Sequence, residues 1–209
     1  MVILAPTAKS MCHMQVNTVE NVAGEFPGVK VMIKLTQIDK NLYYFKISLV
    51  TDDIDKDNER FTSDALYKMS QLFIGKTGIV EAYGKTYRPR IFDAWVKKKH
   101  STYILKALAY IYLNNQEDVD NFSDFLSTHN ECSISLRCGT KACSICGRNQ
   151  FKEPCCHEKG KEYGNHRKCI HELSNIFEVY EWSFAIEPPV QYVGKYCGKC
   201  GERVLGGDE

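Results

Sequence analysis

The stretch CSICGRNQFKEPCCHEKG (143–160) contains four cysteines and one histidine, and it decides how the rest of the chain is interpreted. Its first part, Cys143-Ser-Ile-Cys146 followed by Gly147, is a Cys-x-x-Cys turn that can direct both sulfur atoms at one ion, and a Cys/His pair nearby can complete a tetrahedral zinc site. The flanking segments CSISLRC (132–138) and VYEWSFAIEP (179–188) alternate apolar and polar residues, as strands do. We therefore expect a metal-binding insertion between two strands of a β-rich core.

The expected zinc ligands are Cys143, Cys146, Cys155 and His157. Cys156 is an alternative to Cys155, because adjacent thiols rarely reach the same ion, and Cys169 or His171 could replace one of the four. Soft and borderline ligands that leave no open position predict a structural zinc ion rather than a catalytic one.

A second Cys-x-x-Cys unit, formed by Cys197 and Cys200 in KYCGKCGER (195–203), is a further candidate for metal binding. Three arrangements stay open: a four-thiolate ribbon with the first unit, a site shared with Cys12 and His13, or half of a site completed by another chain. No βαβ pattern surrounds either unit, which argues against a redox motif.

The bulk composition limits the class of protein. The chain has 209 residues, is 44% hydrophobic and carries a formal net charge of +1, so it can bury a core and shows no whole-chain electrostatic footprint for DNA or RNA. No apolar run reaches the roughly 18 residues of a membrane span, and no basic residue precedes the short apolar run at the N-terminus. We expect no nucleic-acid or membrane partner, and we interpret the ten cysteines as metal ligands in a reducing cytosol.

The segments outside the cysteine cluster predict a small mixed domain. Segments 31–38 and 42–50 read as a hairpin, and 90–96 and 102–113 as a second strand pair. Thr62 or Ser63 can cap a helix that ends near Phe73, and Asn115 can cap a second helix with a buried stripe that includes Val119, Phe122 and Leu126. This order indicates an α+β or β-barrel-like domain with two helices.

The predicted organisation has three parts. They are an N-terminal arm (1–28), a core domain (29–190) with a zinc-binding insertion (139–175), and a C-terminal tail with the second Cys-x-x-Cys unit (191–209).

Ser133 and Ser135 alternate with apolar residues in the predicted strand before the insertion, and Glu181 lies in the alternating segment after it. A nucleophilic serine needs a base within hydrogen-bond reach, and the pattern supplies none, because His129 lies at the expected end of a helix. The pattern alone therefore favours inert surface serines and a surface carboxylate.

Several segments, taken together and in order, resemble the tailed-phage prohead (capsid maturation) protease family, in particular a zinc-knuckle-bearing branch. The resemblance covers about residues 43 to 190. The segments are YYFKISLVTDDIDKDNERFTSDALYKMSQLFIGKTGI (43–79), RIFDAWV (90–96), ECSISL (131–136), CSICG (143–147), CCHEKGKEY (155–163) and YEWSFAIEP (180–188).

The resemblance implies a fold and a function. The fold would be a small assemblin-like β-barrel with flanking helices, and the activity that of a serine endopeptidase with Ser133 as nucleophile and Glu181 as the acidic member of the triad. The implied partners are phage scaffold and major capsid proteins, and the implied location is the host cytoplasm, within or beside the procapsid. An oligomeric form stays open.

The chain departs from the family pattern at two positions. The family's catalytic histidine follows the GKTGI segment, but GKTGIVEAYGKTYRPRIF (75–92) has Ala82 at that position, and Ser135 stands where a glycine is expected. Losing a general base typically costs about 100- to 10,000-fold in rate.

Three hypotheses therefore compete. The first is a prohead-protease-like protein with a degenerate active site. The second is a non-catalytic, zinc-stabilised module that binds phage structural proteins. The third is an unrelated zinc-ribbon adaptor that binds nucleic acid or protein. The near-neutral net charge argues against a nucleic-acid partner.

Overall fold

The structure is a computed structural model that describes residues 33–184, except for residues 56, 130 and 131. The N-terminal arm (1–28) and the tail with Cys197 and Cys200 lie outside the described residues.

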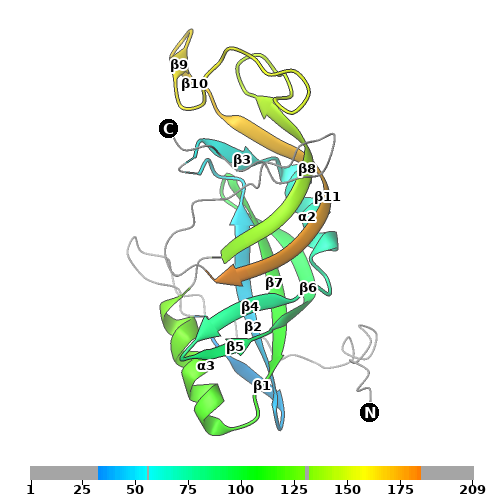
Figure 1. Cartoon of the computed structure of the whole chain (residues 1–209), viewed down its shortest axis with the longest axis vertical. Coiled ribbons are helices and arrows are strands. Elements are labelled where there is room, and N and C mark those ends of the chain that lie inside the picture. Colours follow the sequence, from blue (N-terminus) through cyan, green and yellow to red (C-terminus); the bar gives the residue numbers. More distant parts are fainter. Residues whose placement is uncertain (1–32, 56, 130–131, 185–209) are drawn as a thin grey trace. The chain divides into compact units, whose positions relative to one another are not determined.

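An antiparallel sheet of four strands forms one side of the core (Figure 1). Its order is β1-β2-β7-β6, with β1 at Thr36–Asp39, β2 at Leu42–Thr51, β6 at Arg90–Lys99 and β7 at Thr102–Tyr112. Both predicted strand pairs are confirmed as antiparallel partners. Alternation along β2 buries Phe45, Ile47 and Leu49 and exposes Lys46 and Ser48, as expected for a sheet with one solvated face.

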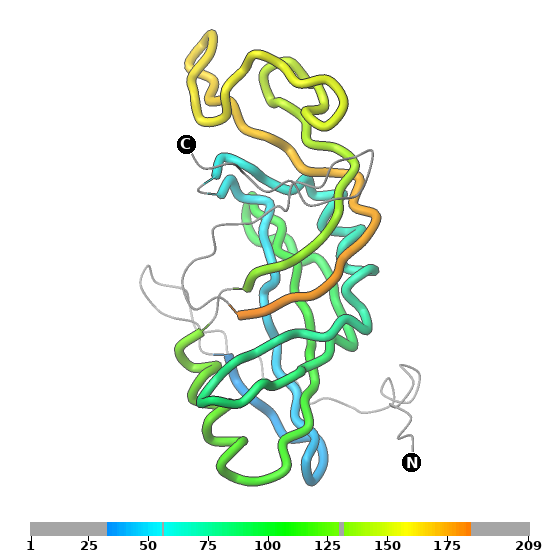
Figure 2. Tube along the Cα trace, viewed as in Figure 1, coloured from blue at the N-terminus to red at the C-terminus, as the bar shows by residue number. Residues whose placement is uncertain are grey.

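The second sheet is built around one long strand, β11 (His171–Phe184). Antiparallel β8 (Cys132–Cys143) lies along one edge of β11, from the pair Cys143–His171 to the pair Cys132–Phe184. The other edge of β11 pairs in parallel with β3 (Glu59–Phe61) and β4 (Gly78–Ala82), and β5 (Lys85–Tyr87) forms a hairpin with β4. Figure 2 shows β8 and β11 running side by side and the cysteine-rich segment connecting them.

The connection between β8 and β11 is therefore the predicted insertion between two strands. It carries its own small hairpin, β9 (Glu162–Tyr163) with β10 (Arg167–Lys168). We call residues 144–170 the knuckle.

Both predicted helices are confirmed, together with their caps. In α2 (Ser63–Leu72) the Thr62 side chain accepts a hydrogen bond from the Ala65 amide, and in α3 (Gln116–Thr128) the Asn115 side chain accepts one from the Asp118 amide. The buried stripe of α3 consists of Phe122, Phe125 and Leu126, whereas Val119 packs at its margin.

The inner faces of both sheets and the buried faces of both helices share one hydrophobic core. Trp182 is fully buried at its centre, where its ring packs against Phe45 and Phe184. Gly78 passes directly beneath this ring, since a Cβ atom there would lie 2.4 Å from the indole. A glycine is therefore required at this crossing of β4 and β11.

The α+β class with two helices is confirmed, but the described strands form two open sheets and no closed barrel. Backbone hydrogen bonds between residues 75–78 and 89–91, with an isolated bridge at Thr77–Arg90, connect the two sheets where β4 and β6 begin, and among the described strands no ladder joins β8 to β2. The hairpin β4–β5 is an addition to the predicted elements, because strands of five and three residues are too short to show a clear alternation of apolar and polar residues.

Candidate metal centre

Four of the predicted donors meet at one point in the knuckle and its base. The ligand atoms of Cys143, Cys146, Cys155 and His157 all lie within 4.8 Å of one another. Two ligands of a tetrahedral zinc ion, each about 2.3 Å from the metal, are separated by about 3.8 Å, so a set of this size can close around one ion. The predicted ligand set is thus brought together by the fold, as a possible metal-binding cluster of three sulfurs and one imidazole.

Local hydrogen bonds shape the first half of this cluster. The Gly147 amide donates to the Cys143 carbonyl at 2.8 Å, and the Cys143 amide donates to the Arg148 carbonyl at 2.9 Å. Gly147 has a φ of 75°, which a glycine adopts without strain. This turn places the two sulfurs of the Cys-x-x-Cys unit on the same side of the chain.

The second half of the cluster consists of Cys155 and His157, and both have supporting partners. The Gln150 side-chain amide donates to Cys155 Sγ at 3.3 Å, and the His157 ring packs edge-on against Tyr163, with centroids 4.7 Å apart. The buried His157 Nδ1 has no hydrogen-bond partner in the part of the chain that the structure describes. A buried ring nitrogen without a partner fits a metal ligand, because a metal bond would satisfy it.

The thiols of the cluster differ in acidity. Burial raises the pKa of Cys143. Burial also acts to raise the pKa of Cys155, but hydrogen bonds from the His157 backbone and the Gln150 side chain outweigh it and lower this pKa to about 6. A lowered pKa favours the thiolate of Cys155, which is the form that binds metal.

Cys169 is a fifth donor close to the same centre. Its sulfur is fully buried and lies 3.7 Å from Cys143 Sγ, the separation expected for two thiolates on one zinc ion. The two segments are held together because the Ser144 amide donates to the Ile170 carbonyl and the Ile170 amide donates to Ser144 Oγ, each at 3.0 Å. Of the alternatives raised by the sequence, Cys156 is exposed and His171 lies outside the four-donor group.

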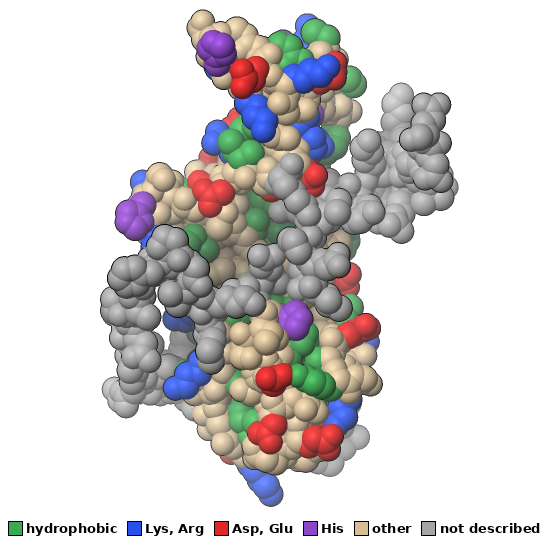
Figure 3. Space-filling view, turned by 90° about the vertical axis from the view of Figure 1, so that its left-hand side faces the viewer, with side chains coloured by type: hydrophobic (Ala, Val, Ile, Leu, Met, Phe, Trp, Pro, Cys, Tyr) green, Lys and Arg blue, Asp and Glu red, His purple; other side chains and the backbone are tan. Residues whose placement is uncertain are grey.

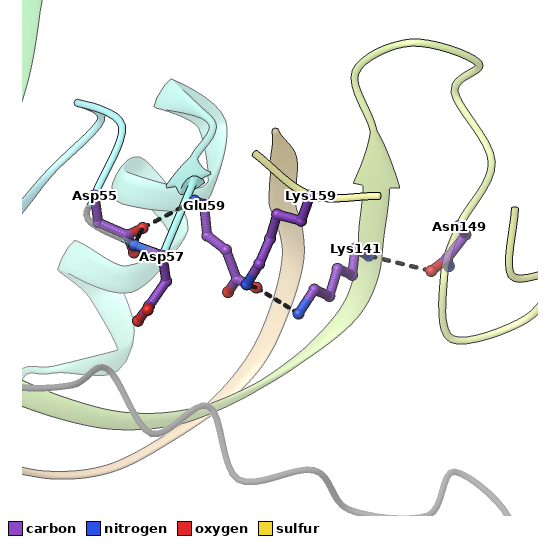
Figure 4. Close-up of polar contacts among 6 residues, drawn as sticks. All are labelled: Asp55, Asp57, Glu59, Lys141, Asn149 and Lys159. Atoms are coloured by element: carbon purple, nitrogen blue, oxygen red, sulfur yellow. Dashed lines mark hydrogen bonds and ion pairs between the residues drawn. The ribbon is translucent and has the colours of Figure 1, made fainter. Parts of the chain in front are cut away.

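A buried ion-pair cluster lies where the knuckle joins the core (Figure 4). Glu59 on β3 is only 3% exposed, and its carboxylate contacts the ammonium groups of Lys141 at 2.5 Å and Lys159 at 2.6 Å. Burial alone would raise the pKa of Glu59, but the two lysines outweigh it and hold this pKa below its usual value. Because Lys141 belongs to β8 and Lys159 to the knuckle, Glu59 ties both to β3.

The sequence does not predict this cluster. Its members are up to 100 residues apart, and neither a lone glutamate after a charged loop nor scattered lysines signals a pairing.

The two predicted catalytic residues share one face of the β8–β11 ladder. Ser133 lies opposite Ser183, and Glu181 lies opposite Ser135, the next outward residue along β8. Glu181 is exposed and Ser133 is half-buried. None of the histidines that the structure describes, at positions 100, 129, 157, 166 and 171, hydrogen-bonds to Ser133.

Ala82, at the position where the resemblance implies a histidine, lies on the other face of this sheet. In the parallel pairing of β4 with β11, Gly78 lies beside Trp182, so Gly78, Val80 and Ala82 point to the core. Ala82 is 8% exposed and belongs to the core cluster. The side chain at position 82 therefore points away from Ser133.

Comparisons with known proteins leave the family open: no family model, no curated protein and no solved structure matches this chain. Among the residues that the structure describes, no helix has the length and apolar character needed to cross a membrane.

Proposed function

We propose that this chain is a non-catalytic assembly protein related to prohead proteases, in which zinc holds the knuckle in one conformation so that it can bind phage structural proteins. The absence of catalytic activity in this proposal is supported by the residues that surround Ser133. Ser133 and Glu181 have no imidazole partner within the described ranges, and position 82 faces the core. A serine without a general base loses most of its nucleophilic reactivity.

The knuckle supports the zinc-dependent part of the proposal. Residues 144–170 contain little regular structure beyond the two-residue strands β9 and β10, so few backbone ladders stabilise them. Four ligands closed around zinc would supply the missing stability, as in other small zinc-binding units. Zinc would act there as a structural cross-link, while Gln150, Tyr163 and Ser144 hold the donors in place.

The partners in this proposal, phage scaffold and major capsid protein, come from the resemblance, and so does the location with the procapsid. The proposal does not extend to the assemblin-like barrel that the resemblance implies, because the described strands form two open sheets.

The test is co-expression of the full chain with a candidate phage scaffold protein and a candidate major capsid protein, followed by affinity purification. We expect Ser133→Ala to co-purify with the same partner as wild type, and Cys143→Ser to lose it. The matched control is Cys156→Ser, which removes an exposed thiol outside the four-donor group. Loss of binding in Ser133→Ala, or full binding in Cys143→Ser, would contradict the proposal.

A second candidate, an active serine endopeptidase, is favoured by one observation: Ser133 and Glu181 share a face of the β8–β11 ladder. Cleavage of the scaffold or capsid protein would be read on a gel with wild type, Ser133→Ala and the neighbouring Ser135→Ala. Cleavage abolished only by Ser133→Ala would establish this candidate and remove the non-catalytic proposal.

A further inference from the structure

The outer face of the four-stranded sheet β1-β2-β7-β6 is basic and aromatic. The side chains that alternate with the buried ones on β2, β7 and β6 point to this face, and the pairing register places Lys46 beside Leu108, and Lys106 beside Trp95. Helix α2 packs on the opposite, inner face, where Leu66 and Met69 join the core. No helix of the described ranges covers the outer face.

Lysines dominate the charge of this face. Lys46, Lys97, Lys99 and Lys106 lie on it, and Asp93 is the one acidic residue that the β6 register places among them. Within the described part of the chain, no carboxylate forms an ion pair with Lys46, Lys97 or Lys106. Burial lowers the pKa of Lys106, and repulsion from the positive charges of Lys97, Lys46 and Lys99 lowers it further. An anionic ligand would relieve that repulsion.

A group of acidic residues lies apart from this face, on helix α3. The helix carries Glu117, Asp118, Asp120 and Asp124 and no basic residue, and acidic side chains are prominent in the lower part of the molecule, where this helix lies (Figure 3). These four carboxylates offset the four lysines of the outer face in the formal net charge of +1, which therefore does not describe the local charge of that face. The expectation of no nucleic-acid partner rests on the net charge alone.

Aromatic rings lie among the lysines. Trp95 is half-buried, and the ammonium of Lys46 lies 5.6 Å from its ring centroid. Further along the sheet, Tyr110 packs against Phe92 and Tyr112, with centroids 6.2 and 6.1 Å apart, and Tyr112 is 54% exposed. Trp95 pairs with Lys106, four residues from Tyr110 on β7, so the two aromatic positions are about 13 Å apart along the strand, at about 3.3 Å per residue.

We propose that this face, formed by Lys46, Lys97, Lys106, Trp95 and Tyr110, binds single-stranded nucleic acid. Phosphates would contact the lysines and unpaired bases would stack on the two aromatic positions, the combination by which single strands are generally bound. A duplex fits less well because its bases are already stacked and cannot use the rings. The proposal rests on the outer sheet face and does not depend on the zinc-dependent function proposed above.

The test uses the full chain and fluorescein-labelled 12-mers, oligo(dT) and oligo(rU), followed by anisotropy at several salt concentrations. Each phosphate contact on a single strand contributes about −0.7 to the slope of log K against log salt, so three to four lysines predict a slope of about −2 to −3. Either oligomer binding in this way supports the proposal.

Matched variants locate the site. The double variant Lys46→Glu, Lys97→Glu should weaken binding by at least about 10-fold, while Lys68→Glu, Lys152→Glu, which makes the same charge change at exposed positions on α2 and the knuckle, should leave it within about 2-fold. Trp95→Ala should weaken binding by roughly 10-fold through lost stacking. Thermal unfolding of each variant confirms that the fold is retained.

Tryptophan fluorescence gives an independent readout. The chain has two tryptophans, and Trp182 is fully buried, so quenching by an unlabelled oligonucleotide reports on Trp95. Absence of salt-dependent binding, equal loss in both double variants, or binding of poly-glutamate with no binding of either oligonucleotide would overturn the proposal.

Discussion

Replacing Glu59 with glutamine tests whether the buried ion-pair cluster holds the knuckle against the core. The substitution keeps the size of the side chain but removes its charge, which leaves the ammonium groups of Lys141 and Lys159 facing a neutral amide (Figure 4). Lys141 is 15% exposed and Lys159 is 32% exposed, so Lys159 can turn towards water more easily than Lys141.

The expected cost follows from this geometry. Removing one partner of a buried ion pair typically costs about 3–5 kcal/mol, because a charge is left buried and unpaired. We expect the lower end, about 3 kcal/mol, since Lys159 reaches solvent. For a chain of this size the loss corresponds to a fall in Tm of about 6–12 °C.

The assay is urea unfolding of the zinc-loaded protein, with Glu172→Gln as the control. Glu172 on β11 forms an ion pair with Arg60 on β3, but these side chains are 31% and 42% exposed, so their pair contributes about 0–1 kcal/mol. The double variant Glu59→Gln, Lys141→Met should be more stable than Glu59→Gln alone, because it removes the stranded charge.

The effect of Glu59→Gln should also depend on pH. The two lysines hold the pKa of Glu59 below its usual value, so its stabilising contribution is present above the unfolded-state pKa of about 4.3 and is lost as pH falls through the folded-state pKa. The stability difference between wild type and Glu59→Gln should be constant from about pH 5 to 8 and shrink below about pH 4. A loss at pH 7 no larger than that of Glu172→Gln would refute the argument.

Three further predictions concern the metal centre and the core. Cys143→Ser, or zinc chelation, should make the knuckle sensitive to trypsin within residues 144–170 while β2 and β7 stay protected. The control variant Cys156→Ser should leave the cleavage pattern unchanged, and cleavage spread evenly over the chain would contradict a local role of the metal. X-ray absorption spectroscopy at the zinc edge should show three sulfur ligands and one nitrogen ligand if His157 is the fourth ligand, or four sulfur ligands if Cys169 replaces it. Cys169→Ser should alter the spectrum only if Cys169 is a ligand. Gly78→Ala should cost about 1–3 kcal/mol in urea unfolding, because its methyl group would meet the immobile Trp182 ring, while Gly164→Ala, which meets no atom within 4 Å, should be neutral; equal effects would show that Trp182 can move aside.

The sequence predicts the parts of the fold that are specified by interactions between residues only a few positions apart. Both helix caps, at Thr62 and Asn115, were located because a single side chain and an amide three residues later suffice to define them. The hairpin of β6 and β7 followed from strand alternation around a short turn. The four-donor set followed from spacing, since Cys-x-x-Cys and a nearby Cys-Cys-His are themselves local patterns.

Three features of the structure do not follow from the net charge, from the resemblance or from short sequence windows. The net charge of +1 hid the lysines of the outer sheet face, because α3 cancels them in the sum without lying among them. The barrel was expected from the resemblance, whereas the described strands leave the two sheets open. Strands β3, β4 and β5 have five residues or fewer and owe their conformation to pairing with β11 or with each other, which a short sequence window does not contain.

The chain's own residues thus determined which segments become helices, hairpins and a metal-binding turn, since the interactions that specify them span only a few positions. Tertiary structure alone decided that Cys169 comes within 3.7 Å of Cys143, that Glu59 meets two lysines from β8 and the knuckle, and that position 82 faces the core. The pairing register of β8 with β11, together with the packing of both sheets on one hydrophobic core, determines those contacts. Such a register is selected by the burial of many distant side chains at once, so no single stretch of sequence contains it.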